Sequence, residues 1–306
     1  MRKAFVKTLT DLAARDPDVM LLTGDLGFSV FEEFAQNFPR QYLNAGLSEQ
    51  CMVGMAAGLA MEGKKVFVYS IIPFIAFRAL EQVRDDLCYQ HLPVKLIGVG
   101  SGFVYGRLGG THHAIDDVGV MTSLPQMTVF SPGDPLETAK ITEFSMTLKG
   151  PCYVRLNRAG DPTVHTEESI SAWRPGEPLR LAGNGSGIAV LAMGNALPLA
   201  VQVGQGLQSA GRACSVYSVP TLKPVDEQKF LGVLEKADTV VCIEEHVQSN
   251  GLTSLVAGLM AAHAVKGPLR SFALADEFSH SVGSQEFLQR RSGLTVENIL
   301  KKIEGI

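Results

Sequence analysis

The chain has 306 residues, of which 46% are hydrophobic and 19% are charged, and its formal net charge is -4. This length and apolar content suit two α/β domains that each bury a core of their own. The slightly acidic balance argues against nucleic acid or an anionic membrane surface as a partner, because both attract basic proteins.

The five cysteines are scattered along the chain, and their spacing is not that of a metal site. We therefore expect them to be reduced thiols in a cytoplasmic protein. The apolar stretches are interrupted by Gly, Pro or charge well short of the ~18 residues that a membrane span needs. No targeting or transmembrane segment is expected.

The first half of the chain alternates short β-branched runs with helical patterns, which is typical of parallel sheets with crossover helices. Helices are predicted over 2–15 and 135–148. The candidate strands are 19–23, 65–70, 94–99, 127–130 and 152–156.

The second half repeats the alternation, with candidate strands at 187–193, 213–218, 239–243 and 269–273. Before it comes a polar stretch rich in Gly and Pro, which favours a linker over 166–185. The sequence therefore predicts an α/β protein with two doubly wound domains, at 1–165 and 186–306.

The segment from Leu43 to Ala60 presents a carboxylate where a loop becomes a helix of small residues. Ser48 can cap this helix and Glu49 lies in its first turn, while glycines and alanines such as Gly54 and Ala57 allow close backbone packing. On this segment alone, a glutamate that offsets the helix dipole explains Glu49 as well as a functional role does.

The run Gly-Leu-Ser-Glu-Gln-x-Met-Val-Gly-Met-Ala-Ala-Gly-Leu-Ala at 46–60 resembles the segment of transketolases and their relatives that carries the thiamine diphosphate glutamate. Residues 18–26, 65–70 and 109–113 also resemble that family, in the same order. The resemblance implies a thiamine diphosphate pyrimidine-binding fold followed by a transketolase C-terminal-like domain. It also implies that Glu49 promotes removal of the cofactor's reactive thiazolium proton.

The resemblance assigns further site residues. The family's aromatic position falls on Ile75 here, so Phe74 or Phe77 is expected to stack on the aminopyrimidine, with Phe74 slightly favoured, although aromatic residues at this spacing also occur in ordinary cores. His112 matches the histidine of a Thr-His pair that faces the substrate and is the second expected catalytic residue. Asp25 matches an aspartate close to the cofactor.

Three arginines are expected to bind substrate. Arg158 matches the arginine that binds substrate phosphate in transketolases, and Arg155 matches one used in deoxyxylulose-phosphate synthases; either could instead be a solvated surface cation. Arg107 lies in the loop before His112. Leu108 and Gly100 depart from the acidic residue and the histidine that transketolases have there, which puts an ordinary pentose phosphate pocket in doubt.

No Gly-Asp-Gly occurs in this chain, whereas the family binds the diphosphate through a metal held by that segment. No later group of hard metal ligands replaces it. The resemblance therefore implies that a partner α subunit holds the diphosphate and Mg²⁺, and that this chain also dimerises, giving an α2β2 assembly.

The predicted function is that of the β subunit of a split transketolase, which transfers a two-carbon ketol unit between sugars or other carbonyl compounds. A 2-oxo-acid dehydrogenase β subunit and a deoxyxylulose-phosphate-synthase-like carboligase are alternatives within the superfamily. A non-catalytic regulatory or scaffolding subunit is an alternative from another class.

Overall fold

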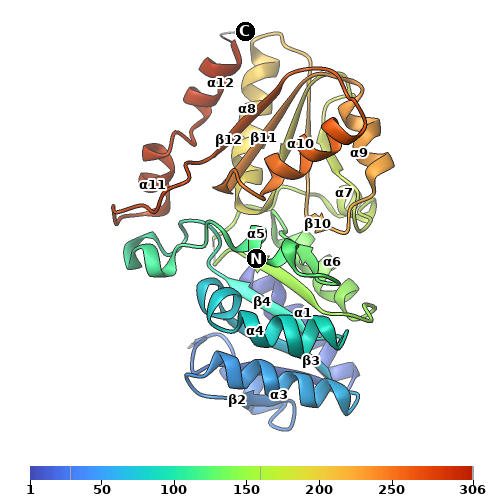
Figure 1. Cartoon of the computed structure of the whole chain (residues 1–306), viewed down its shortest axis with the longest axis vertical. Helices are drawn as coiled ribbons and strands as arrows, with labels where there is room; N and C mark the ends of the chain where they lie inside the picture. Colours follow the sequence, from blue (N-terminus) through green and yellow to red (C-terminus); the bar gives the residue numbers. More distant parts are fainter. Residues whose placement is uncertain (28, 159, 305–306) are drawn as a thin grey trace.

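The computed structural model describes residues 1–27, 29–158 and 160–304. Two α/β domains lie one above the other along the longest axis, with the N-terminal half in the lower part of Figure 1 and the C-terminal half in the upper part. Each domain is built on its own, mainly parallel sheet. The predicted fold class, with two doubly wound domains, is confirmed.

The sheet of the lower domain has seven strands in the order β10-β5-β6-β4-β3-β1-β2, and β10 alone runs antiparallel to its neighbour. Its strands are β1 (Val19–Thr23), β2 (Tyr42–Asn44), β3 (Lys65–Ile71), β4 (Lys95–Val99), β5 (Thr128–Phe130), β6 (Cys152–Leu156) and β10 (Thr221–Lys223). The helices are α1 (Arg2–Arg15), α2 (Glu32–Asn37), α3 (Glu49–Met61), α4 (Leu80–Gln82), α5 (Asp117–Ser123) and α6 (Pro135–Ser145), together with π-helical turns η1 (Phe74–Arg78) and η2 (Val83–Tyr89) and 3-10 turns η3 (Gly106–Leu108) and η4 (Gly110–His112).

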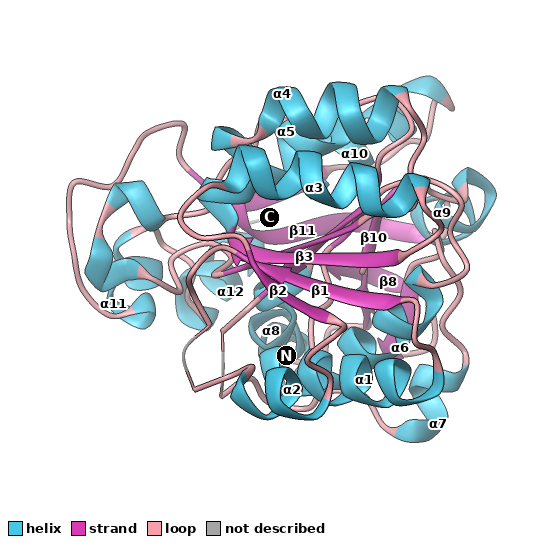
Figure 2. Cartoon of the chain, turned by 90° about the horizontal axis from the view of Figure 1, so that it is seen from below, coloured by secondary structure: helices cyan, strands magenta, loops and turns pink. Residues whose placement is uncertain are grey.

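Helices cover both faces of this sheet, with α3 and α4 on one side and α1, α2 and α6 on the other (Figure 2). Strand β3 shows why, because its side chains alternate between two hydrophobic clusters. Val66 and Val68 pack in the cluster that contains the buried side of α3, whereas Phe67 and Tyr69 pack with α1. Both faces of β3 are thus apolar, as expected for a parallel sheet buried on both sides.

The sheet of the upper domain has the order β12-β11-β8-β9-β7, and only β7 is antiparallel to its neighbour. Its strands are β7 (Leu179–Ala182), β8 (Gly187–Ala192), β9 (Cys214–Ser218), β11 (Ala237–Val247) and β12 (Leu269–Leu274). The remaining helices are α7 (Glu167–Ser171), α8 (Leu197–Ser209), α9 (Glu227–Leu234), α10 (Leu252–Ala262), α11 (Gln285–Arg291) and α12 (Val296–Glu304), with a 3-10 turn η5 (Gly194–Ala196).

All nine strands predicted from the sequence are present, with ends that differ by a few residues. The short strands β2, β7 and β10 were missed. Strand β7 and helix α7 lie inside the expected linker 166–185, so that segment is not an irregular connection. The exact domain boundaries stay a prediction.

The two domains are joined by more than the connecting chain. Strand β10 comes from the C-terminal half of the sequence but extends the lower sheet at β5. The Lys223 ammonium donates to the carbonyls of Thr122 and Leu124, at 2.8 and 2.6 Å. Within the described residues, none of the helices is both long and apolar enough to cross a membrane.

Candidate active site

The candidate site lies at the carboxyl ends of the parallel strands β1, β3, β4 and β6, where ligands of open α/β sheets bind. The loops that follow these strands carry Asp25, Phe74, His112 and Arg158. Glu49 joins them from the start of α3, which follows β2. The fold therefore brings residues far apart in the sequence to one edge of the sheet.

Glu49 is buried, with 1% of its surface exposed. Its Oε2 accepts a hydrogen bond from Nη1 of Arg78 at 2.7 Å, and its Oε1 accepts one from the Ser70 hydroxyl at 3.3 Å. The end of β1 packs close by, because a Cβ atom added to Gly24 would lie 3.8 Å from Oε1. Ser48 occupies the N-cap position but its side chain makes no capping hydrogen bond, so the expected cap is wrong.

Phe74 is connected to Glu49 by the side chain of Arg78, which contacts both residues. The guanidinium carbon of Arg78 is 4.6 Å from the centroid of the Phe74 ring, and this ring also contacts that of His112, at 5.3 Å between centroids and 71° between planes. Phe77 instead packs against the hydrophobic core. These contacts favour Phe74 as the ring that faces the site.

His112 lies between Phe74 and Tyr105, and Tyr105 in turn contacts Arg158. Its ring is 6.4 Å from that of Tyr105, and the guanidinium carbon of Arg158 lies 5.6 Å from the Tyr105 centroid. Burial lowers the pKa of His112, which favours the neutral imidazole near neutral pH. The Thr111 hydroxyl is 3.0 Å from Nδ1 of His112. A neutral imidazole can accept a proton or donate a hydrogen bond.

Tyr105 packs directly over Gly100, one of the two positions that depart from the transketolase pattern. Gly100 has a φ of +99°, and a Cβ atom there would collide with the Tyr105 ring. The ring therefore fills space that a side chain at position 100 would need. Burial raises the pKa of Tyr105, so its phenol stays protonated and can donate a hydrogen bond.

The remaining predicted residues differ in their surroundings. Arg155 is buried, and its guanidinium donates to the Asp117 carboxylate and to the carbonyls of Ala114 and Glu245. Those contacts favour a structural role over the predicted contact with substrate. Arg107 is exposed on η3, and the exposed Asp25 exchanges hydrogen bonds with the Asn44 side chain.

Among the described residues, one group could place three ligand atoms around a metal ion: Asp134, Glu137 and His165. The polar atoms of this group already make hydrogen bonds to one another and to the backbone. His165 Nε2 lies 2.7 Å from Glu137 Oε1, and Asp134 accepts hydrogen bonds from the backbone of residues 137, 164 and 165. We interpret the group as a fixed junction between α6 and the segment that leaves β6.

Sequence reasoning missed Arg78, although it contacts both Glu49 and Phe74. In a helical pattern it looks like a solvated surface cation. A contact between residues 74 and 78 is compatible with any helix, but nothing in the sequence indicates that Arg78 also reaches the Glu49 carboxylate. The packing of Tyr105 over Gly100 likewise has no sequence signal of its own.

Two family models match this chain. The model of the transketolase pyrimidine-binding domain matches residues 1–160, and that of the transketolase C-terminal domain matches residues 179–299. Together they cover most of the chain, and apart from β10 the strands of each observed sheet lie within the residues matched by one model.

Similar proteins agree with these models. The chain is 34% identical to a subunit of the apulose-4-phosphate transketolase of Phocaeicola vulgatus, over 98% of this chain and 95% of that protein. It is 31% identical to a 6-deoxy-6-sulfo-D-fructose transketolase subunit of Clostridium sp., over 98% and 92%. A solved structure described as a split gene transketolase, inactive beta4 tetramer, has 31% identity and a TM-score of 0.90, covering 99% of this chain and 97% of that one. The chain belongs to the transketolase family.

Proposed function

We propose that this chain is the β subunit of a split, thiamine diphosphate-dependent transketolase, which transfers a two-carbon ketol unit between sugars or other carbonyl compounds. The observation that carries the proposal is the buried Glu49 carboxylate, which the Arg78 guanidinium links to the face of Phe74. A carboxylate beside an aromatic ring is what an aminopyrimidine needs, because the ring gives a stacking surface and the carboxylate a hydrogen-bond partner.

The residues present fit that group. The Arg78 guanidinium, a planar group with N–H donors at its edge, lies against the Phe74 ring and donates to Glu49. A flat ring with a nitrogen at its edge can make the same pair of contacts, one with the Phe74 face and one with the Glu49 carboxylate. When bound, thiamine diphosphate supplies the carbon nucleophile and electron sink for breaking and forming a bond next to a carbonyl.

Each residue of the site has a role in this proposal. Glu49 holds the proton shared with the pyrimidine nitrogen, and Phe74 fixes the plane of that ring. His112 faces the reacting oxygen of the substrate, where it donates a hydrogen bond or moves a proton. Arg158 and Arg107 attract an anionic group of the substrate. Asp25 lies at the cofactor end of the site, after β1.

The partner is part of the proposal. Relatives that match most of this chain, and are matched over most of their own length, are named as single subunits of apulose-4-phosphate transketolases. We therefore propose an α subunit that contributes the diphosphate site and Mg²⁺, with two copies of each chain assembled in the cytoplasm. The alternatives of a 2-oxo-acid dehydrogenase subunit, a deoxyxylulose-phosphate-synthase-like carboligase and a scaffolding subunit receive less support from these relatives.

Calorimetry tests the proposal directly. Thiamine diphosphate with Mg²⁺ is titrated into this chain alone, and into the complex formed by co-expression with a candidate α subunit that carries the Gly-Asp-Gly segment. We expect binding by the complex and little by the chain alone. Absence of binding by both would contradict a catalytic role, and tight binding by the isolated chain would contradict the shared site.

A further inference from the structure

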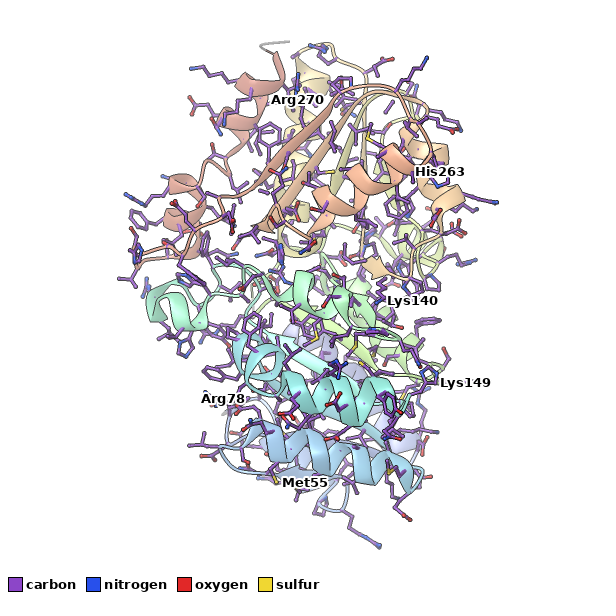
Figure 3. The ribbon with its side chains drawn as sticks, in the orientation of Figure 1. Met55, Arg78, Lys140, Lys149, His263 and Arg270 are labelled. Carbon is purple, nitrogen blue, oxygen red and sulfur yellow. The ribbon has the colours of Figure 1, made fainter. Side chains whose placement is uncertain are left out.

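Arg78 lies where the proposed aminopyrimidine has to bind. Its Nη1 donates to Glu49 Oε2 at 2.7 Å, and its guanidinium carbon lies 4.6 Å from the Phe74 centroid. Figure 3 labels Arg78 in the lower domain, beside the layer formed by α3 and α4. One side chain thus uses both the carboxylate and the ring that the cofactor would use.

The two groups are chemically alike. A guanidinium is flat, stacks on aromatic faces and presents N–H donors along its edge. An aminopyrimidine is also flat and also pairs with a carboxylate along its edge. Glu49 Oε1 accepts a hydrogen bond from Ser70, and Oε2 is the oxygen that Arg78 contacts, so we expect both groups to use Oε2. The guanidinium and the aminopyrimidine cannot lie against the same part of Phe74 at the same time.

The local structure lets Arg78 leave. Its side chain is 49% exposed, whereas that of Glu49 is 2% exposed. Arg78 is the last residue of the π-helical turn η1, a type of turn often found at functional sites. Its long side chain can therefore turn into solvent without opening the core, while Glu49 stays in place.

We propose that Arg78 is a positioning residue that occupies the aminopyrimidine's place beside Glu49 until the cofactor displaces it. The inference rests on the proposed function. In this position Arg78 gives the buried Glu49 carboxylate a partner before the cofactor arrives, since an uncompensated buried charge is costly. It also lowers the apparent affinity for the cofactor by the fraction of time for which the place is free.

The matched variants are Arg78→Met, which keeps the length of the side chain without its charge, and Arg84→Met, at an exposed arginine paired with Asp85. Both are assembled with the α subunit and titrated with thiamine diphosphate and Mg²⁺. We expect Arg78→Met to bind more tightly, by about tenfold if the guanidinium holds the place nine-tenths of the time. Arg84→Met should bind like the unchanged protein.

A residue that only supports the fold would give the opposite result, because its removal would weaken cofactor binding. Equal or weaker binding by a folded Arg78→Met complex therefore overturns the proposal. Arg78→Lys keeps the charge beside Glu49 but has no flat face for Phe74, so its affinity should fall between those of the other two proteins.

A measurement on the unchanged protein covers the case in which Arg78→Met does not fold. Nitrogen-15 NMR of the arginine side chains in the complex should show one slowly exchanging guanidinium, absent from the Arg78→Lys spectrum, that is released when thiamine diphosphate is added. Cofactor binding with this signal unchanged overturns only the role of Arg78. If the unchanged complex binds no cofactor, the proposed function itself fails.

Discussion

Glu49 is buried, contacts the Arg78 guanidinium and lies at the start of a helix, and this position suits a group that shares a proton with a ring nitrogen. Glu49→Gln keeps the size and one acceptor but cannot supply the acid. We expect hydrogen–deuterium exchange at the cofactor's reactive carbon to slow by about 10²–10⁴-fold in the assembled enzyme. NMR of quenched samples measures that rate.

Glu81→Gln is the matched control for this prediction, because Glu81 is exposed on the neighbouring helix α4. Its exchange rate should equal that of the unchanged protein. Exchange at the normal rate in Glu49→Gln, with the cofactor bound, would remove the assigned role of Glu49.

Glu244 gives a pH dependence that is separate from catalysis. Burial raises its pKa from 4.5 to about 7, against the opposing hydrogen bonds from Thr253 and Leu252. Between these pH values the folded chain holds a proton that the unfolded chain has lost. The contribution of Glu244 to stability is therefore complete below about pH 4.5 and is lost as the pH rises through 7.

Glu244→Gln should remove this dependence. The free energy of unfolding, measured in urea, should fall between pH 5.5 and pH 8.5 by about 2 kcal/mol more in the unchanged protein than in the variant, at about 1.4 kcal/mol per pH unit up to the pKa. The exposed Glu235 supplies the control, since Glu235→Gln should keep the original slope. Equal slopes for Glu244→Gln and the unchanged protein would contradict the prediction.

At the scale of elements, two helix starts that look alike in sequence differ in structure. Asp134 at the N-cap of α6 accepts hydrogen bonds from the backbone N–H groups of Glu137, Val164 and His165. Ser48 at the N-cap of α3 accepts none through its side chain. We expect Asp134→Ala to lower the free energy of unfolding by about 3 kcal/mol or more, because buried N–H groups lose their acceptor.

Ser48→Ala is the comparison, and it should change the free energy of unfolding by less than about 0.5 kcal/mol. Urea unfolding followed by circular dichroism measures both. Similar losses in the two variants would mean that the Ser48 hydroxyl caps α3 in solution.

The elements also explain which parts of the molecule could be predicted. The central strands could be predicted from their β-branched runs, because a strand that is buried on both faces has apolar side chains along most of its length. Strands β2, β7 and β10 have three or four residues, and their pairing depends on neighbours far away in the sequence. Glu49 and His112 were found through motif order. Arg78 was not, because its contact with Glu49 joins residues 29 positions apart that only the folded chain brings together.

At the scale of the whole molecule, the two domains share buried polar contacts. Arg155 at the lower sheet donates to the Glu245 carbonyl of β11, and the backbone N–H of Phe103 donates to the Glu245 carboxylate. Lys223, the last residue of β10, adds its contacts with the carbonyls of Thr122 and Leu124. Separation of the domains would expose these groups, so we expect the chain to unfold in one cooperative transition.

Arg155→Met tests that coupling. The variant leaves the Asp117 carboxylate buried without its cation, at 0% exposure, and removes the link to β11. Loss of one partner of a buried ion pair costs about 3–5 kcal/mol. Scanning calorimetry should therefore show a single transition in both proteins, shifted to lower temperature in Arg155→Met. The exposed Arg158 is the control, since Arg158→Met should leave the transition where it is. Two transitions, of which only the one from the lower domain moves, would mean that the domains unfold independently.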